Sequence, residues 1–293
     1  MSWRTVIVSQ QAKLDYKMGY MVVRGEETRR VLIDEIAILL LENPAVALTG
    51  CLIEKLVEKK VRVIFCDSTR SPTAELTPYR GSHDSSAKLR AQAVWDAETK
   101  AAVWREIVAE KIRQQYVFLL SLKKTEEAAL LDTYRRQVEP GDATNREGHA
   151  AKVYFNALFG KSFTRGALDP RNAALNYGYS LILSAVNREV AVNGYLTQFG
   201  IFHDNMFNPF NLSCDLMEPF RVLVDRMVYT MPLPSFETAD KHALWKLLEQ
   251  PVAIDGCRQL TANAIKIYVR SVFDAINDRD PAKLLFFEII EDG

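Results

Sequence analysis

The residue pattern of this 293-residue chain changes once, near residue 70, so two unlike parts are expected. Before that point, short apolar runs rich in branched residues alternate with turn sequences, a pattern typical of β-strands. The runs lie at residues 6–8, 20–23, 31–33, 37–41 and 61–65, and one helix is predicted at residues 50–60. We therefore predict a β-rich N-terminal domain over residues 1–70.

After residue 87 the apolar side chains recur at helical spacing, beginning with Trp95, Trp104 and Ile107. Further helices are predicted at residues 126–137, 146–159, 170–193, 217–230, 238–249 and 261–276. The stretch 71–86 contains Pro72, Pro78 and Gly81 and is predicted to be a linker. The expected fold class is α+β, with a small β-rich N-terminal domain followed by a larger all-α C-terminal domain over residues 87–293.

The composition excludes several classes of protein but does not determine the binding partner. The 37 Lys and Arg residues balance the 37 Asp and Glu residues, and a hydrophobic content of 48% excludes extended disorder. Because there is no basic arm, nucleic acid would have to bind folded clusters of charge. No membrane-length apolar run or charged-then-apolar leader is visible. The four cysteines are far apart, which argues against a zinc knuckle and a disulfide framework, so we expect a cytoplasmic protein.

Three stretches contain residues able to perform chemistry, and each also has a simpler structural explanation. Glu147 lies at the start of a predicted helix, where Thr144 and Glu147 have the spacing of a capping box. His203 lies in a predicted loop, where a lone histidine is more often a surface or hydrogen-bonded residue. Asp215 and Glu218 are three residues apart and would share one helix face, or else cap its first turn.

Taken together, these carboxylates and the imidazole suit a divalent ion that prefers oxygen but accepts one nitrogen, such as Mg²⁺ or Mn²⁺. Basic side chains of the kind that a phosphodiester substrate needs occur around them in the sequence. They are Arg146, Lys152, Arg165, Arg171, Arg221 and Arg226, interleaved with aromatic residues such as Phe202 that could stack on bases. The residues alone predict a possible metal-dependent phosphodiesterase and leave helix capping open.

Several of these segments resemble the CRISPR-associated spacer-acquisition integrases, the family called CRISPR-associated protein one. They are residues 145–159, the sequence NAALNYGY at 172–179, Phe202-His203, and CDLMEPFR at 214–221. Residues 2–8, Leu14-Asp15-Tyr16-Lys17, 61–67 and 79–83 resemble the type II branch of that family. The resemblance extends over essentially the whole chain, with no departure at the metal positions.

By this resemblance, Glu147, His203 and Glu218 would be the three catalytic metal ligands, and Asp215 an additional acidic residue beside them. The family's β-domain pairs into a homodimer, and two dimers flank a dimer of a small ferredoxin-like companion protein. The assembly carries a short double-stranded DNA and joins its 3′ ends to the repeat array, with the DNA 3′-OH as nucleophile. A type II setting also implies other adaptation proteins and the large RNA-guided nuclease.

Two alternatives remain at this point: a metal-dependent nuclease that cuts branched DNA without integrating it, and a non-catalytic DNA-binding scaffold whose acidic residues only cap helices. A small-molecule enzyme is disfavoured, because the chain has no GxGxxG after a strand, no Walker sequence and no HExxH.

Overall fold

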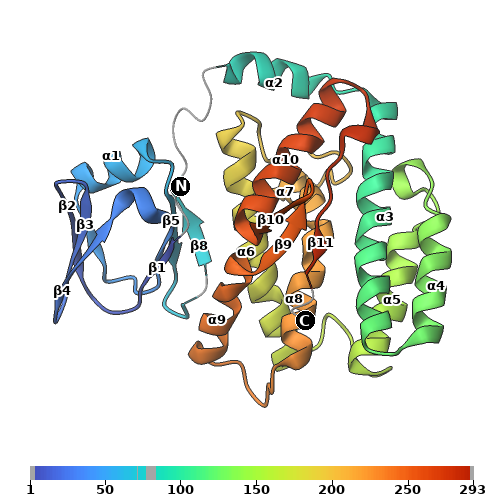
Figure 1. Cartoon of the computed structure of the whole chain (residues 1–293), viewed down its shortest axis with the longest axis horizontal. Helices are drawn as coiled ribbons and strands as arrows, with labels where there is room; N and C mark the ends of the chain where they lie inside the picture. The colour runs from blue at the N-terminus through green and yellow to red at the C-terminus, as the bar shows by residue number, and fades with distance from the viewer. Residues whose placement is uncertain (1–3, 71, 77–83, 291–293) are drawn as a thin grey trace. The chain divides into compact units, whose positions relative to one another are not determined.

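The computed structural model describes residues 4–70, 72–76 and 84–290, and divides the chain into two compact units, 1–79 and 80–293. The first unit contains two four-stranded sheets (Figure 1). One has the order β1-β5-β7-β8, and the other has the order β4-β3-β2-β6. The strands are β1 (Arg4–Val8), β2 (Lys13–Lys17), β3 (Tyr20–Arg24), β4 (Thr28–Leu32), β5 (Ile36–Leu41), β6 (Ala47–Leu48), β7 (Arg62–Cys66) and β8 (Pro72–Glu75).

The core of this unit is built from the apolar runs seen in the sequence. β1, β5 and β7 are parallel, while β2, β3 and β4 form an antiparallel meander. Helix α1 (Gly50–Glu58) is capped by Thr49, whose side chain accepts a hydrogen bond from Leu52 N at 3.4 Å. Its apolar face places Leu52 and Leu56, both fully buried, in the core with Leu14, Met21 and Leu39. The N-terminal part is compatible with the predicted β-rich domain.

The predicted linker, residues 71–86, is not irregular throughout, and that prediction is wrong at two places. Pro72–Glu75 forms β8, which pairs antiparallel with β7, and α2 begins at Ser85. A proline at the first residue of a strand on the sheet edge is compatible with pairing, because its missing N–H is not needed there. The first unit therefore extends beyond residue 70. Residues 71 and 77–83 lie outside the described part of the chain.

The second unit is mainly helical, as predicted (Figure 1). Its helices are α2 (Ser85–Ala93), α3 (Ala97–Ser121), α4 (Thr125–Arg136), α5 (Arg146–Phe159), α6 (Pro170–Val192), α7 (Asn211–Leu216), α8 (Arg221–Thr230), α9 (Thr238–Trp245) and α10 (Thr261–Asn277). The long helix α3 packs against α4, α5, α8 and α10. No helix in the described ranges is both long and apolar enough to cross a membrane.

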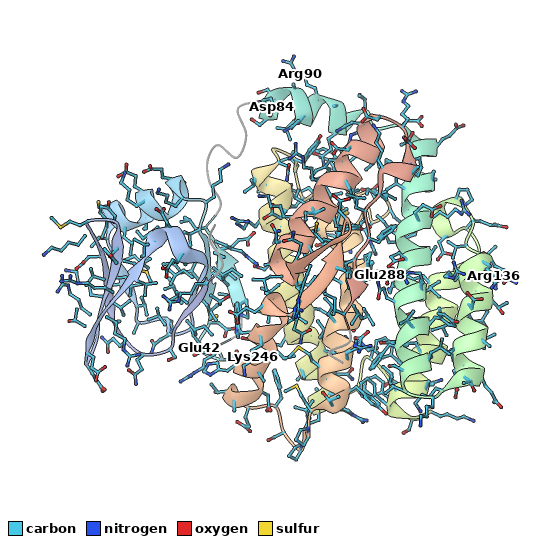
Figure 2. The ribbon with its side chains drawn as sticks, in the orientation of Figure 1. Glu42, Asp84, Arg90, Arg136, Lys246 and Glu288 are labelled. Carbon is cyan, nitrogen blue, oxygen red and sulfur yellow. The ribbon has the colours of Figure 1, made fainter. Side chains whose placement is uncertain are left out.

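The second unit also contains a small sheet, so the prediction of an all-α domain is wrong. Strands β9 (Pro251–Ile254), β10 (Cys257–Leu260) and β11 (Glu288–Ile289) pair antiparallel in the order β10-β9-β11. The hairpin turns at Asp255 and Gly256, both with positive φ (51° and 67°), which is the backbone that an Asp-Gly turn favours. Glu288 on β11 (Figure 2) pairs with Arg113 of α3 at 2.8 Å. That contact helps to hold the sheet against α3.

The predicted helix at residues 217–230 is interrupted at its start. α7 ends at Leu216, a 3-10 helix, η3, spans Glu218–Phe220, and α8 starts at Arg221. Pro219 has no N–H to donate to a continuous α-helix, which accounts for the change of geometry there. The interruption places Glu218 in a short, buried segment. Phe220 beside it packs on Phe287 with ring centres 4.6 Å apart.

Candidate functional site

Glu147 projects from the first turn of α5 and takes no part in capping that helix. The side chain of Asn145 accepts a hydrogen bond from Gly148 N at 3.3 Å, and Asp142 accepts from Arg146 N at 2.8 Å and Glu147 N at 3.0 Å. The capping box of Thr144 and Glu147 is therefore excluded. A Cβ at position 148 would lie 2.7 Å from Asn145 Oδ1, so a larger residue there would displace the side chain that caps α5. The Glu147 carboxylate is left available and pairs with Lys111 on α3.

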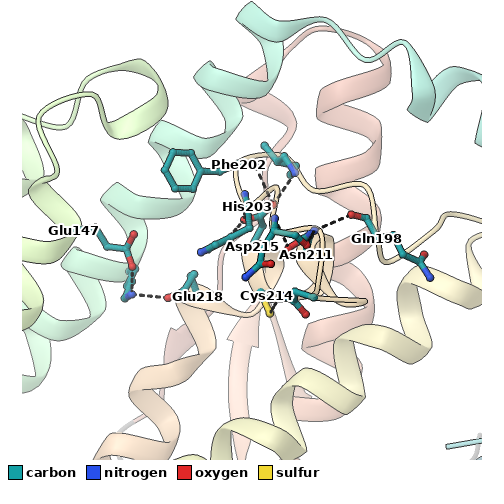
Figure 3. A network of polar contacts seen from close by, with 12 residues as sticks. Glu147, Gln198, Phe202, His203, Asn211, Cys214, Asp215 and Glu218 are labelled. Carbon is teal, nitrogen blue, oxygen red and sulfur yellow. Dashed lines mark hydrogen bonds and ion pairs between the residues drawn. The ribbon is translucent and has the colours of Figure 1, made fainter. Parts of the chain in front are cut away.

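Glu218 is buried in η3 and is surrounded by two cations. It accepts hydrogen bonds from Lys111 Nζ at 2.5 Å and from Arg221 Nε at 2.9 Å. Burial opposes ionisation of this carboxyl, but the charges of Arg221 and Lys111 outweigh it and lower its pKa. The carboxylates of Glu147 and Glu218 point toward each other and share the same ammonium (Figure 3).

Lys111 is a residue of this site that the sequence did not predict. It lies 36 residues before Glu147 and 107 before Glu218. Burial lowers the pKa of Lys111, but the charges of Glu218 and Glu147 more than compensate and raise it above the ordinary value. One signal was present in the sequence: Lys111 follows Trp104 and Ile107 at helical spacing, on the face that the apolar pattern assigns to the core.

His203 and Asp215 form the other half of the site. Asp215 on α7 is fully buried, and its carboxylate accepts backbone hydrogen bonds from Ile201 (2.6 Å), Phe202 (3.0 Å) and His203 (3.1 Å). His203 Nδ1 lies 2.5 Å from Asp215 Oδ1, so Nδ1 carries the proton and donates it. The predicted role of Asp215 as an N-cap is excluded, because it lies inside α7 and binds a distant loop.

The loop that carries His203 is restrained from both sides. A Cβ at position 200 would lie 2.2 Å from the His203 carbonyl oxygen, so only glycine fits there. Asn211 Nδ2 donates to the carbonyl oxygens of Gln198 (3.1 Å) and Asn205 (3.0 Å) (Figure 3). The loop therefore orients the imidazole, and Nε2 has no hydrogen-bond partner among the residues that the structure describes.

The negative charges of Glu147 and Glu218 contribute to the pKa of His203. The pKa of His203 is raised, first by its hydrogen bond to Asp215 and then by the Asp215, Glu218 and Glu147 charges, against a partial burial that lowers it. Within the described ranges, however, no three His, Cys, Asp or Glu side chains lie close enough together to hold a metal ion. The structure thus joins Glu147 to Glu218 and His203 to Asp215, and the metal triad stays a prediction.

An aromatic stack adjoins His203. Phe202 lies flat on Trp104, with ring centres 4.6 Å apart and planes 3° apart, and Trp104 meets the imidazole edge-on at 5.8 Å. Trp104 is fully buried, whereas Phe202 is 49% exposed. A shallow pocket of about 280 Å³ beside this pair is lined by Trp95, Lys100, Trp104 and Phe202, among others. An exposed ring face next to the imidazole is suited to stack on a nucleobase.

The six basic residues predicted to contact DNA have different environments. Arg221 is committed to Glu218, and Arg171 pairs with Asp169 at 2.5 Å. Arg165 donates to the side chains of two asparagines on α6, at 2.5 and 2.6 Å. Arg226 lies over the Phe118 ring at 4.9 Å, and Arg146 over the Tyr134 ring at 5.8 Å. Lys152 is exposed on α5, the helix that carries Glu147.

Asp225 on α8 is a further buried carboxylate, held by two tyrosines. Tyr154 Oη donates to it at 3.0 Å and Tyr179 Oη at 2.5 Å, and all three side chains are buried. Burial raises the pKa of Asp225 to about 6, although both tyrosine hydrogen bonds and the charge of Arg221 oppose that shift. This network connects α5, α6 and α8 around the site.

The raised pKa of Asp225 predicts a stability that falls as the pH rises. Unfolded aspartate has a pKa near 3.9, so between about pH 4 and pH 6 the folded state binds more protons than the unfolded state. Stability therefore falls across this range, and the full loss is reached above about pH 6. The asparagine side chain does not titrate, so the free energy of unfolding of Asp225→Asn relative to wild type is expected to be higher at pH 7.5 than at pH 4, by up to about 3 kcal/mol. Urea unfolding at both pH values measures this, with the exposed Asp274→Asn as control. An equal effect at both pH values would contradict it.

Comparison with known proteins identifies the family. Residues 5–232 match the profile of "CRISPR associated protein Cas1". The "CRISPR-associated endonuclease Cas1" of Neisseria meningitidis serogroup C (strain 8013) is 31% identical over 296 residues, which cover 99% of this chain and 97% of that protein. The "CRISPR-associated endonuclease Cas1 3" of Thermus thermophilus is 28% identical over 245 residues, covering 77% of this chain and 73% of that protein.

Solved structures show the same fold. A casposase bound to its integration product aligns with a TM-score of 0.75 and 17% identity, covering 96% of this chain and 92% of that one. A CAS1 protein from Thermotoga maritima aligns with a TM-score of 0.74 and 17% identity, covering 93% and 97%. From the profile match and the full-length relative at 31% identity, the chain belongs to the family of CRISPR associated protein Cas1.

Proposed function

We propose that this Cas1 chain is a metal-dependent DNA endonuclease and integrase of CRISPR adaptation, which joins the 3′-OH ends of a short captured duplex to the repeat array. One observation carries the proposal: the carboxylates of Glu147 and Glu218, from separate elements, converge on a single cation beside an oriented His203. The names of the relatives, which are endonucleases, support nuclease activity. The casposase with its integration product supports strand transfer on this fold.

The donor set suits a divalent ion, although the three side chains would have to move closer together to bind one. Two carboxylates already share one positive charge, and Asp215 accepts the hydrogen bond that His203 Nδ1–H donates, so Nε2 offers its lone pair when the ring is neutral. A carboxylate that orients a histidine in this way is the usual arrangement behind a metal-bound imidazole. Glu147, Glu218 and His203 would hold Mg²⁺ or Mn²⁺. Such an ion, when bound, polarises a phosphate and lowers the pKa of the attacking hydroxyl.

The protein's own residues would bind and position the DNA. Lys152 and the edge of Arg221 would bind phosphate, and the exposed ring of Phe202 would stack on a base next to the reacting phosphate. The DNA 3′ oxygen forms the new bond to phosphorus, and the target strand's 3′ oxygen leaves as a new 3′-OH. No serine or cysteine nucleophile is needed, and with water as nucleophile the same site would hydrolyse DNA.

The proposed partners follow from the family. They are the captured double-stranded DNA and the repeat array, a second copy paired through the β-rich unit, the small ferredoxin-like companion, and other type II adaptation proteins with the RNA-guided nuclease. A solved Cas6-RT-Cas1–Cas2 complex supports an assembly of this kind, since its chain aligns with a TM-score of 0.74 over 98% of this chain.

The experiment uses purified protein and labelled branched DNA with a free 3′-OH, in Mn²⁺ or EDTA, with and without the companion protein. A longer labelled strand that requires metal supports transesterification. Shortened strands alone favour the nuclease without integration. No metal-dependent product under either condition would return the chain to the scaffold alternative, although the capping role that first supported it is excluded for Thr144 and Asp215.

Lys152 is expected to contact phosphate more strongly than Arg146. Both were predicted to contact DNA, but Arg146 is half-buried over Tyr134, whereas Lys152 is exposed. Lys152→Gln should weaken DNA binding without sequence preference and reduce the slope of log K against log salt by about one. Fluorescence anisotropy across a salt series measures the slope, and Lys266→Gln, an exposed lysine on α10, serves as control. An unchanged slope would assign Lys152 another role.

A further inference from the structure

Lys111 is unusual because its ammonium is buried and yet contacts two acidic groups of the proposed metal site. Its side chain is 10% exposed and pairs with both Glu147 and Glu218. A lysine this buried requires a reason, because desolvating an ammonium costs several kcal/mol unless it is well paired. Here the reason is the pair of carboxylates, which together hold the ammonium in its charged form.

The charges of the two glutamates are already balanced by two cations without any added ion. Glu147 and Glu218 supply two negative charges, while Lys111 and Arg221 supply two positive charges. A divalent ion added to this group would leave an excess of two positive charges in a poorly solvated place, which is unfavourable. The excess falls if Lys111 withdraws from the carboxylates and if a DNA phosphate brings negative charge to the site.

The ammonium and a divalent ion would also compete for the same oxygens. Lys111 Nζ takes one oxygen of Glu147 (Oε1) and one of Glu218 (Oε2). An ion held by both carboxylates needs those groups, so the two cations exclude each other to a large extent. The lysine side chain has a flexible four-carbon stem, which allows the ammonium to move and to bind a phosphate instead.

We propose that Lys111 is an internal competitor of the metal: it holds Glu147 and Glu218 together in the free protein and gives them up when the ion and a DNA phosphate bind together. This inference rests on the proposed metal-dependent function. It makes metal binding and DNA binding mutually reinforcing, and such linkage is reciprocal, typically within about 5–150-fold. The free protein would then hold metal weakly and become loaded at the substrate.

The test measures Mn²⁺ binding without DNA, by electron paramagnetic resonance of the free ion, in wild type and Lys111→Met. Methionine keeps most of the stem and removes the charge, so Mn²⁺ affinity is expected to rise about tenfold or more. Lys111→Arg keeps the charge and should bind Mn²⁺ as wild type does.

The double variant Lys111→Met with Glu147→Gln should lose the increase in Mn²⁺ affinity. That result would show that the more tightly bound ion lies at this site. An uncleavable DNA duplex should strengthen Mn²⁺ binding in wild type and much less in Lys111→Met.

A stability measurement covers the case in which Lys111→Met is poorly folded. Its two carboxylates lack their ammonium, so its melting temperature should be lower than that of wild type and should rise more steeply with Mn²⁺, as ligand binding to the folded state requires. If Lys111→Met binds Mn²⁺ no more tightly than wild type, and wild-type binding depends on Glu147, Lys111 has only a structural role. The inference about Lys111 is then wrong, while the proposed metal-dependent function is unaffected. If no variant shows a Glu147-dependent Mn²⁺ site, the proposed function fails as well.

Discussion

Glu147→Gln is expected to reduce metal-dependent strand cleavage and strand transfer by at least about 100-fold while leaving the protein folded. Its side chain is 25% exposed, and glutamine has the same shape without the charge. Lys111 would still pair with Glu218, so the buried ammonium keeps one partner. The size of the loss follows because removing even a residue that only supports a metal ligand costs roughly 10–100-fold.

The measurement is the branched-DNA assay, with thermal unfolding recorded on the same preparations. Glu126→Gln is the matched control, because Glu126 also lies in the first turn of a helix, α4, and is exposed. More than about a tenth of wild-type transfer in Glu147→Gln would refute the ligand assignment.

Glu218→Ala is a less clean test of the ligand assignment, because Glu218 is buried between two cations. Glu218 is 3% exposed and pairs with both Lys111 and Arg221. Alanine would leave two buried cations with half of their counter-charge, and breaking a buried pair in this way costs roughly 3–5 kcal/mol. Loss of transfer in Glu218→Ala would therefore mix chemistry with stability, which is why Glu147 is the better position.

Asp215→Asn is expected to lower activity by roughly 10–100-fold and to destabilise the protein by about 3 kcal/mol. The buried carboxylate accepts three backbone hydrogen bonds from residues 201–203 and receives His203 Nδ1. An asparagine turns an amide N–H toward these donors, so at least one of them loses its acceptor. The loop and the imidazole would then lose their fixed orientation.

Three readouts separate this effect from general damage. The strand-transfer assay gives the activity, urea unfolding gives the stability, and NMR titration of the imidazole gives the pKa of His203. That pKa should fall, because the hydrogen bond to Asp215 is the first cause of its elevation. Asp204→Asn, an exposed neighbour in the same loop, should change none of the three. Wild-type activity in Asp215→Asn would show that this contact does not position His203.

Local signals in the sequence predicted much of the fold. Helix α5 has the predicted bounds, 146–159, and α6 and α10 each differ from prediction by one residue at the C-terminal end. The errors occurred where a local signal was misread. Asp255-Gly256 is a hairpin turn inside a domain that was predicted to be all-α, and Pro72 begins an edge strand inside a predicted linker.

The sequence by itself determined the family and the chemical types at the site, because the motifs around Glu147, His203 and Glu218 are local and specific. The alternation of apolar residues likewise determined the two-part architecture, since the side-chain period reports which face is buried. Only the tertiary structure decided that Glu147 and Asp215 are not helix caps, and that Lys111 joins carboxylates far from it in sequence. Capping and ion pairing are settled by which groups meet across the folded chain, and spacing along one helix cannot report contacts between helices.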